Sequence, residues 1–181
     1  LRSIATRSSS GSIPSIIQDL SAHLLARDFD LVLVETVGAG QSEVRCAAIA
    51  DRIILVEGPT RGDGIQAEKA GLLELADLIV VNKADIEGAE KVVNHLKISL
   101  GIGANPPTIV KVSALTGEGI DNLSQMILKL ELRQDSLKAR MRQRLLMSHE
   151  SIIITNPIFE STIDRMAEEG LSIESALEEL R

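Results

Sequence analysis

Residues 31–43 read LVLVETVGAGQSE, and the interpretation of the whole chain starts from this stretch. Four apolar residues run directly into Glu35, and Gly38 and Gly40 follow. An unbroken aliphatic run is typical of a strand that is buried on both faces of a parallel sheet. An acid at the end of such a strand, followed by a glycine turn and a helix, is how open α/β sheets build ligand sites. The stretch therefore predicts a strand over residues 30–37 that brings Glu35 and Gly38 to a nucleotide site.

Predicted strands and helices alternate along the chain as far as the helix that begins at residue 120. Aliphatic runs predict further buried strands at residues 52–57, 77–81 and 108–112. Apolar positions at helical spacing predict helices at residues 12–28, 41–51, 65–75 and 87–100, and one more from residue 120. Alternation of this kind predicts an α/β fold with a mostly parallel sheet flanked by helices and joined by right-handed crossovers.

The character of the sequence changes beyond residue 132. Residues 133–150 are highly charged, and apolar residues recur there at helical spacing. We therefore expect a nucleotide-binding domain over residues 1–132 and a helical extension over residues 133–181. Arg140, Arg142 and Arg144 alternate along the extension, and side chains two positions apart do not share a helix face. These arginines are accordingly expected to be solvated rather than to form a patch for an acidic partner.

Composition excludes several classes of partner. Two Phe, no Trp and no Tyr leave almost nothing for base stacking, and a net charge of −7 argues against nucleic acid. The single Cys46 cannot form an intrachain disulfide, which fits a reducing compartment. No apolar run has the length of a membrane span, and no signal-peptide pattern opens the chain. We expect a cytoplasmic protein without a membrane partner, and a fragment, because the chain begins at Leu1 in what reads as a strand.

Asn82, Lys83 and Asp85 belong to an NKAD motif at the end of a predicted strand. A carboxylate at that position can accept hydrogen bonds from N1–H and the 2-amino group of guanine. Adenine has no such pair of donors, and the unpaired carboxylate would cost about 1–3 kcal/mol or more. Asn82 would buttress the loop, and the Lys83 stem would cover the base plane. Taken alone, the motif is also compatible with an ordinary strand-ending turn, which Asn and Asp favour.

Ser113, Ala114 and Leu115 follow NKAD after one further predicted helix and strand. A backbone N–H in this segment can bond to O6 of guanine, and the small Ser and Ala side chains let the backbone approach the base. The tripeptide carries little information by itself. In this position after NKAD, it predicts the second half of a guanine pocket.

Glu35 has the form of a Walker-B acid. It would hold Mg²⁺, through a water molecule, because Mg²⁺ keeps several of its waters. The N–H of Gly38 would sense the γ-phosphate, since only a residue without Cβ lets the backbone come that close. Gln41 is a candidate for positioning the attacking water. The alternatives are a capped strand end for Glu35 and Gly38, and a polar residue at a helix start for Gln41.

The strings ETVGAGQSE, GDGIQAEKAGLLELAD, NKAD and SALTGEG together resemble the methylmalonyl-CoA-mutase-associated GTPases, the MeaB/ArgK family of SIMIBI-class P-loop GTPases. The resemblance is clearest over residues 2–132. It implies GTP/GDP and Mg²⁺ as ligands, GTP hydrolysis, and a homodimer formed through the C-terminal helices. It also implies a chaperone that assists cobalamin loading of methylmalonyl-CoA mutase or a related cobalamin enzyme. Glu35 matches the family's use of Glu where most GTPases have Asp.

The resemblance also assigns a switch near the nucleotide and the partner mutase. The residues that it implicates are Gly62, Asp63, Gln66 and Lys69. An ordinary strand–helix loop is the alternative for this segment.

One expected element of a P-loop GTPase is missing from the sequence. The chain contains no G-x-x-x-x-G-K-[ST], and in the superficially similar GAGQS at residues 38–42, Gln41 stands where the lysine must be. We therefore expect an incomplete P-loop NTPase-like domain that does not hydrolyse GTP alone. A non-catalytic protein-interaction module is the alternative. A lysine/arginine/ornithine transport-associated ATPase, the older name for this family, is disfavoured because NKAD argues against ATP.

Overall fold

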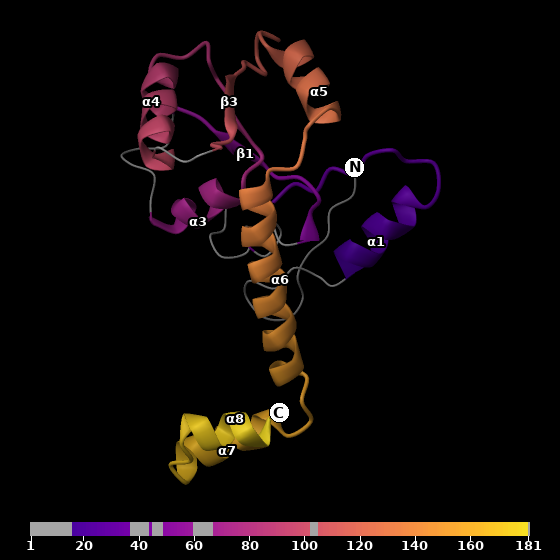
Figure 1. The fold of residues 1–181 in the computed structure, drawn as a ribbon, viewed down its shortest axis with the longest axis vertical. Helices are drawn as coiled ribbons and strands as arrows, with labels where there is room; N and C mark the ends of the chain where they lie inside the picture. The colour runs from indigo at the N-terminus through magenta and orange to yellow at the C-terminus, as the bar shows by residue number, and fades with distance from the viewer. Residues whose placement is uncertain (1–15, 37–43, 45–48, 60–66, 102–104, 181) are drawn as a thin grey trace. The chain divides into compact units, whose positions relative to one another are not determined.

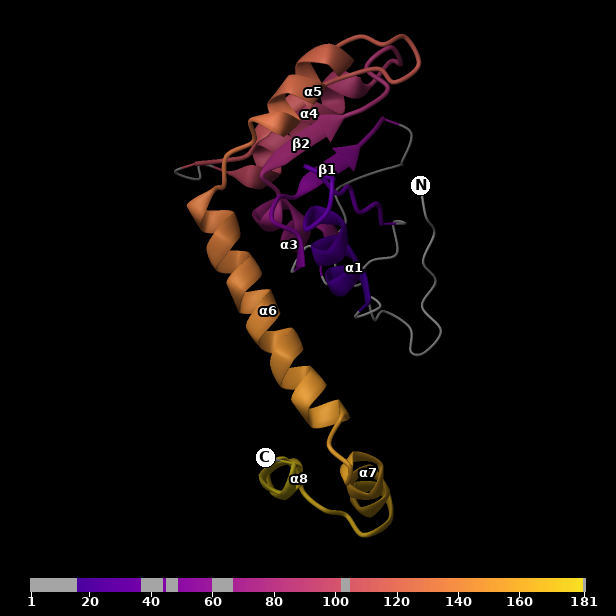
Figure 2. The ribbon, with the colours of Figure 1, turned by 90° about the vertical axis from the view of Figure 1, so that its right-hand side faces the viewer.

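The structure is a computed structural model, and it describes residues 16–36, 44, 49–59, 67–101 and 105–180. For residues 16 and 67–70 the backbone alone is described. The chain forms two compact units, Leu1–Met141 and Arg142–Arg181, which are treated separately below. Figures 1 and 2 show their helices and strands from two directions.

A three-stranded parallel sheet forms the centre of the first unit. Its strands are β1 (Ile54–Glu57), β2 (Leu78–Val81) and β3 (Thr108–Lys111), in the spatial order β1-β2-β3. Ile54 pairs with Leu78, which pairs in turn with Thr108. Every residue of the central strand is buried, as its sequence LIVV predicts for a strand covered on both faces. The sheet confirms the predicted α/β class.

Helices cover both faces of this sheet. Alternate residues of β2 point to opposite sides, so Ile79 and Val81 join one core cluster while Leu78 and Val80 join another. The first cluster packs against α3 (Ala67–Leu75) and α4 (Ala89–Leu100), and the second packs against α5 (Ile120–Leu128). Figure 1 shows α4 and α5 on either side of the strands.

The strand predicted over residues 30–37 is not observed. Residues 31–36 have no regular secondary structure, and Leu33 is 75% exposed. A strand requires a neighbour for its backbone N–H and C=O groups. Among the described strands, β1 pairs only with β2, and Val56 of β1 is itself 61% exposed. An aliphatic run indicates a tendency to be buried, but it does not supply the partner strand, and here the prediction was wrong.

Other predicted helices fall partly outside the described residues, among them the one at 65–75, which is described from Ala67 as α3. The helix predicted at 12–28 is present as α1 (Ile16–Leu25), whereas residues 12–15 are not among the described residues. Of the helix predicted at 41–51, the structure describes residues 44 and 49–51: Val44 and Ile49 are helical, whereas Ala50 and Asp51 are not.

The second unit contains the C-terminal part of α6 (Gln134–Ile154), followed by α7 (Phe159–Glu168) and α8 (Ile173–Glu179). The Ser172 hydroxyl accepts a hydrogen bond from the Ser175 N–H at 3.2 Å and so caps α8. A cavity of about 150 Å³ lies between the end of α6 and α8, lined by His149, Ile152, Ile153, Leu177 and Leu180. Within the described part of the chain, no helix is both long and apolar enough to cross a membrane.

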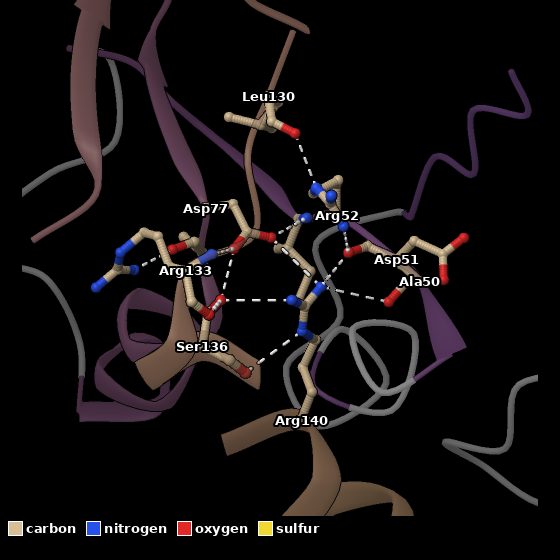
Figure 3. Close-up of polar contacts among 10 residues, drawn as sticks. Ala50, Asp51, Arg52, Asp77, Leu130, Arg133, Ser136 and Arg140 are labelled. Carbon is tan, nitrogen blue, oxygen red and sulfur yellow. Dashed lines mark hydrogen bonds and ion pairs between the residues drawn. The ribbon is translucent and has the colours of Figure 1, made fainter. Parts of the chain in front are cut away.

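A buried carboxylate joins α6 to the sheet within the first unit. Asp77, just before β2, accepts hydrogen bonds from the Ile53 N–H at 2.9 Å and the Ser136 hydroxyl at 2.5 Å. Its Oδ2 lies 3.3 Å from Nη1 of Arg140, and both side chains are almost wholly buried. Nη1 of Arg140 also donates to the Asp51 carbonyl at 2.6 Å (Figure 3). Arg140 is therefore not solvated, which corrects the expectation drawn from its helix position alone.

Arg133 adds a second set of contacts at the same junction. Its backbone N–H reaches Asp77 Oδ1 at 3.4 Å, and its guanidinium donates to the Ala76 carbonyl. Nε and Nη2 both donate to the carbonyl of Asn105, at 3.0 and 2.6 Å. The start of α6 is consequently fixed by charge-assisted bonds to the ends of α3 and of the loop before β3.

Replacing Arg140 by Met tests the energetic weight of this junction. The change leaves the Asp77 carboxylate buried without its counter-ion, so we expect the free energy of unfolding to fall by about 3–5 kcal/mol. Chemical denaturation of the chain measures this quantity. Arg142→Met, at an exposed position on the same helix, is the matched control and is expected to stay within about 0.5 kcal/mol. Equal losses for the two variants would contradict the assignment.

Candidate functional site

The carboxyl ends of β2 and β3 bring the two predicted guanine-binding loops together. Val81 and Lys111 are partners in the parallel ladder; the first loop begins directly after β2, and the second begins one residue after β3. The pairing continues beyond the strands: the Val112 N–H donates to the Val81 carbonyl at 2.9 Å, and the Ala84 N–H donates to the Val112 carbonyl at 2.9 Å. Residues 82–85 and 113–115 are therefore neighbours in space.

Asn82 ties these two loops to each other. Its side-chain Oδ1 accepts from the Lys83 N–H at 2.7 Å and from the Ala114 N–H at 3.1 Å. Its own backbone N–H donates to the Glu57 carbonyl at 2.8 Å, which connects the loop to the end of β1. One half-buried residue, through its side-chain amide and its backbone N–H, thus links the carboxyl ends of all three strands. In this arrangement the Ala114 N–H, a candidate donor to a base, is engaged by Asn82.

Asp85 and Ser113 form the polar pair of the site. Ser113 is fully buried, and its hydroxyl donates to Oδ1 of Asp85 while it accepts from the Thr116 N–H at 3.1 Å. The Ser113 hydroxyl holds the Asp85 carboxylate through Oδ1. Asp85 itself is exposed, so solvent reaches this carboxylate. A carboxylate held in this way has acceptor capacity left for an incoming ligand.

Two residues beside this pair are exposed. Lys83 adopts a left-handed backbone conformation with φ of 62°, which is uncommon for a residue with a Cβ and is concentrated in turns and functional loops. Leu115 is 86% exposed, and it places an apolar side chain at the surface in the segment next to Asp85.

The turn after Ser113 is a part of the site that the sequence interpretation did not assign. The Ser113 N–H donates to the Glu118 carbonyl at 2.9 Å, and the Gly117 N–H donates back to the Ser113 carbonyl at 2.9 Å. The Glu118 N–H reaches the Thr116 hydroxyl at 3.3 Å. The available signal was the pair of glycines around Glu118, because Gly117 and Gly119 have φ of 82° and 75°, which favour glycine.

The remaining predicted residues are not brought to this site by the described part of the chain. Glu35 is exposed on the irregular segment 31–36. The backbone of Lys69 lies in α3, and its side chain is not described. The others lie outside the described residues: Gly38, Gln41, Gly62, Asp63 and Gln66. Among the residues that are described, no group of three or more His, Cys, Asp or Glu could hold a metal ion.

One ion pair lies beside the strand that leads into the site. Lys111 Nζ is 2.6 Å from Glu90 Oε2, and the hydrogen bond from Lys111, followed by its charge, lowers the pKa of Glu90. A lowered folded-state pKa stabilises the fold above the unfolded pKa of Glu90, and this contribution is lost as pH falls through the folded value. Because both side chains are exposed, solvent screens the pair and its contribution is small.

Fold and site together define the class of protein. A parallel α/β sheet, flanked by helices and carrying paired NKAD and SAL loops at its carboxyl edge, is consistent with a P-loop NTPase-like domain. Residues 1–167 match the family described as methylmalonyl Co-A mutase-associated GTPase MeaB, and the chain belongs to this family.

Curated relatives agree with the family. The chain is 42% identical over 135 residues to a putative GTPase of Pyrococcus horikoshii, covering 70% of this chain and 42% of that protein. It is 35% identical over 103 residues to the mitochondrial methylmalonic aciduria type A homolog of Mus musculus, covering 52% and 25%. It is 38% identical over 90 residues to a fused isobutyryl-CoA mutase of Cupriavidus metallidurans, covering 50% and 8%. The chain thus spans less than half the length of these relatives.

Asn82→Ala tests the link between the loops. The change removes the acceptor of two backbone N–H groups, and we expect the free energy of unfolding to fall by about 2 kcal/mol. Amide hydrogen exchange is expected to become faster at Lys83 and Ala114. Asn122→Ala, on the exposed side of α5, is the control and is expected to change stability by less than about 0.5 kcal/mol. Unchanged exchange at both amides would show that Asn82 does not hold the loops.

Proposed function

We propose that the chain contains the guanine-recognising part of a GTPase that assists a cobalamin-dependent methylmalonyl-CoA mutase or a related mutase. The observation that carries the proposal is the Asp85–Ser113 pair between the two adjoining loops at the carboxyl edge of the sheet. Membership of the MeaB family supports GTP as the nucleotide. The names of two relatives, a methylmalonic aciduria type A homolog and a fused isobutyryl-CoA mutase, support a mutase as the partner.

Guanine would be selected by the Asp85 carboxylate. Its oxygens would accept from N1–H and the 2-amino group, and the Ser113 hydroxyl would keep the carboxylate in orientation. The Lys83 stem would cover the base, Asn82 would hold the loop, and a backbone N–H within residues 113–115 would donate to O6. The described residues support this ligand, because the two loops present an exposed carboxylate with acceptor capacity beside a fully buried, hydrogen-bonded serine. Adenine would leave the carboxylate unpaired.

The phosphate side of the site is proposed from the sequence. Glu35 would hold Mg²⁺ through water, and bound Mg²⁺ would neutralise charge on the phosphate oxygens. The N–H of Gly38 would lie toward the γ-phosphate, and Gln41 would orient a water molecule. Four residues would form a switch that contacts the partner: Gly62, Asp63, Gln66 and Lys69.

Two further features belong to the proposal. Residues 133–181 would form a homodimer arm, and the protein would act in the cytoplasm.

A non-catalytic binding module is the second candidate, favoured by one observation: the chain itself contains no G-x-x-x-x-G-K-[ST]. The two candidates share the base pocket and differ in phosphate binding and hydrolysis.

Asp85→Asn tests the base selectivity. The asparagine side chain cannot accept hydrogen bonds from both N1–H and the 2-amino group of guanine, but its NH₂ group can donate to the 2-oxo group of xanthine. We expect the affinity for GMP to fall about tenfold to a hundredfold and the preference to move to xanthosine monophosphate. Titrations followed by NMR of the chain measure both affinities. Asp121→Asn, an exposed acid in the first turn of α5, is the control with unchanged preference. Survival of the guanine preference in Asp85→Asn would refute the role of Asp85.

GTP affinity of the chain tests the phosphate side. Without a lysine-containing phosphate loop in its sequence, the chain has few contacts for the β- and γ-phosphates, and we expect GTP with Mg²⁺ to bind little more tightly than GMP. Isothermal titration calorimetry measures the two affinities, and a phosphate-release assay is expected to show no turnover. Much tighter binding of GTP than of GMP would show that other residues of the chain form a phosphate site.

A further inference from the structure

Gly119 lies where the exit of β3 meets the start of α5. Its φ is +75°, and a Cβ at this position would stand 2.8 Å from the Lys111 carbonyl oxygen and 3.2 Å from Cγ1 of Val112. The shorter distance is one that real Cβ atoms essentially never show, and the opposing atom is backbone rather than the flexible end of a side chain. The contact therefore allows α5 to approach the strand exit only when residue 119 is glycine.

Val112, the residue against which Gly119 packs, holds the NKAD loop. Its N–H donates to the Val81 carbonyl, and its carbonyl accepts from the Ala84 N–H, each at 2.9 Å. Ala84 lies directly before Asp85 in the chain. A displacement of the peptide between Lys111 and Val112 would consequently move the backbone that carries the Asp85 carboxylate.

The turn that ends at Gly119 also holds Ser113, the other member of the pair. The Ser113 N–H donates to the carbonyl of Glu118, the residue directly before Gly119, and the Ser113 hydroxyl accepts from the Thr116 N–H. That hydroxyl also donates to Asp85. Both members of the Asp85–Ser113 pair are thus positioned by the segment that ends at Gly119.

We infer that Gly119 is a positioning residue that sets guanine selectivity, through the close packing of the residue 116–119 turn on the exit of β3. The inference rests on the proposed guanine site. Gly119 need not touch the nucleotide: its missing Cβ lets the turn place the Ser113 hydroxyl and the Asp85 carboxylate at their hydrogen-bonding distance. The 2-amino group of guanine would be the part of the ligand most sensitive to this placement, because Asp85 is its acceptor.

Gly119→Ala and Gly170→Ala form a matched pair in the full 181-residue chain. Both glycines have a positive φ, +75° and +72°, so both variants carry a similar backbone penalty, but Gly170 lies outside the turn and a Cβ there meets nothing within 4 Å. The first measurement needs no nucleotide: NMR amide shifts and hydrogen exchange at Ala84 and Ser113. We expect the amide shifts and the exchange rates to change in Gly119→Ala and to stay near their original values in Gly170→Ala. No difference between the variants would overturn the inference.

The second measurement is the ratio of dissociation constants for IMP and GMP, which differ only in the 2-amino group. We expect the ratio to fall about tenfold in Gly119→Ala relative to Gly170→Ala, because a misplaced carboxylate loses the 2-amino contact first. An equal ratio in the two variants would overturn the inference. If the unmodified chain does not prefer GMP to AMP, the proposed function fails, and the amide measurement still decides whether Gly119 positions the pair.

Thr116→Val covers the case in which Gly119→Ala does not fold. It removes the hydroxyl that accepts the Glu118 N–H and loosens the same turn without adding a clash. We expect a smaller change in the same direction, with a shifted Ser113 amide and an IMP-to-GMP ratio lowered about threefold. If Thr116→Val leaves both unchanged, the turn does not position Ser113 and the inference is wrong.

Discussion

The buried carboxylate of Asp77 is the constraint on which the first unit depends. A charge removed from water costs several kcal/mol unless donors surround it, and here they come from separate parts of the chain. The Ile53 N–H precedes β1, Ser136 lies in the first turn of α6, and Arg140 lies one turn further on. The amino ends of β1 and β2 are thereby held together with the start of α6. A displacement of any one of them would leave part of this network unpaired.

The two ends of β2 have different roles in the molecule. At its amino end Asp77 binds donors from the residue before β1 and from α6, and at its carboxyl end the chain enters the NKAD loop. Four buried aliphatic residues separate these ends and pack on both faces of the sheet. Because close-packed strands do not deform easily, the network at one end helps to define where the loops at the other end begin.

Sequence patterns predicted those features whose cause is local or follows from topology. The run LIVV specified β2, and the parallel arrangement placed NKAD beside SAL because the carboxyl ends of such strands share one edge. The sequence patterns gave wrong predictions where the structure depends on a residue or strand that is distant in the sequence. Arg140 looked solvated because spacing along a helix contains no information about Asp77, and residues 31–36 looked like a strand because an aliphatic run does not reveal whether a neighbour is available. The roles of Glu35 and the switch residues stay predictions.

The two glycines of the turn, Gly117 and Gly119, also show that a sequence pattern does not reveal a tertiary contact. Both Gly117 and Gly119 have a positive φ, and for either one local conformation alone explains a glycine. Only the folded chain distinguishes them, because the Lys111 carbonyl faces Gly119 and open space faces Gly117. The conformational preference favours glycine at both positions, whereas the tertiary contact excludes every side chain at Gly119. The pair formed by the exposed Asp85 and the buried Ser113 is therefore positioned by the absence of a side chain at Gly119, a cause that a list of ligand-contacting side chains does not contain.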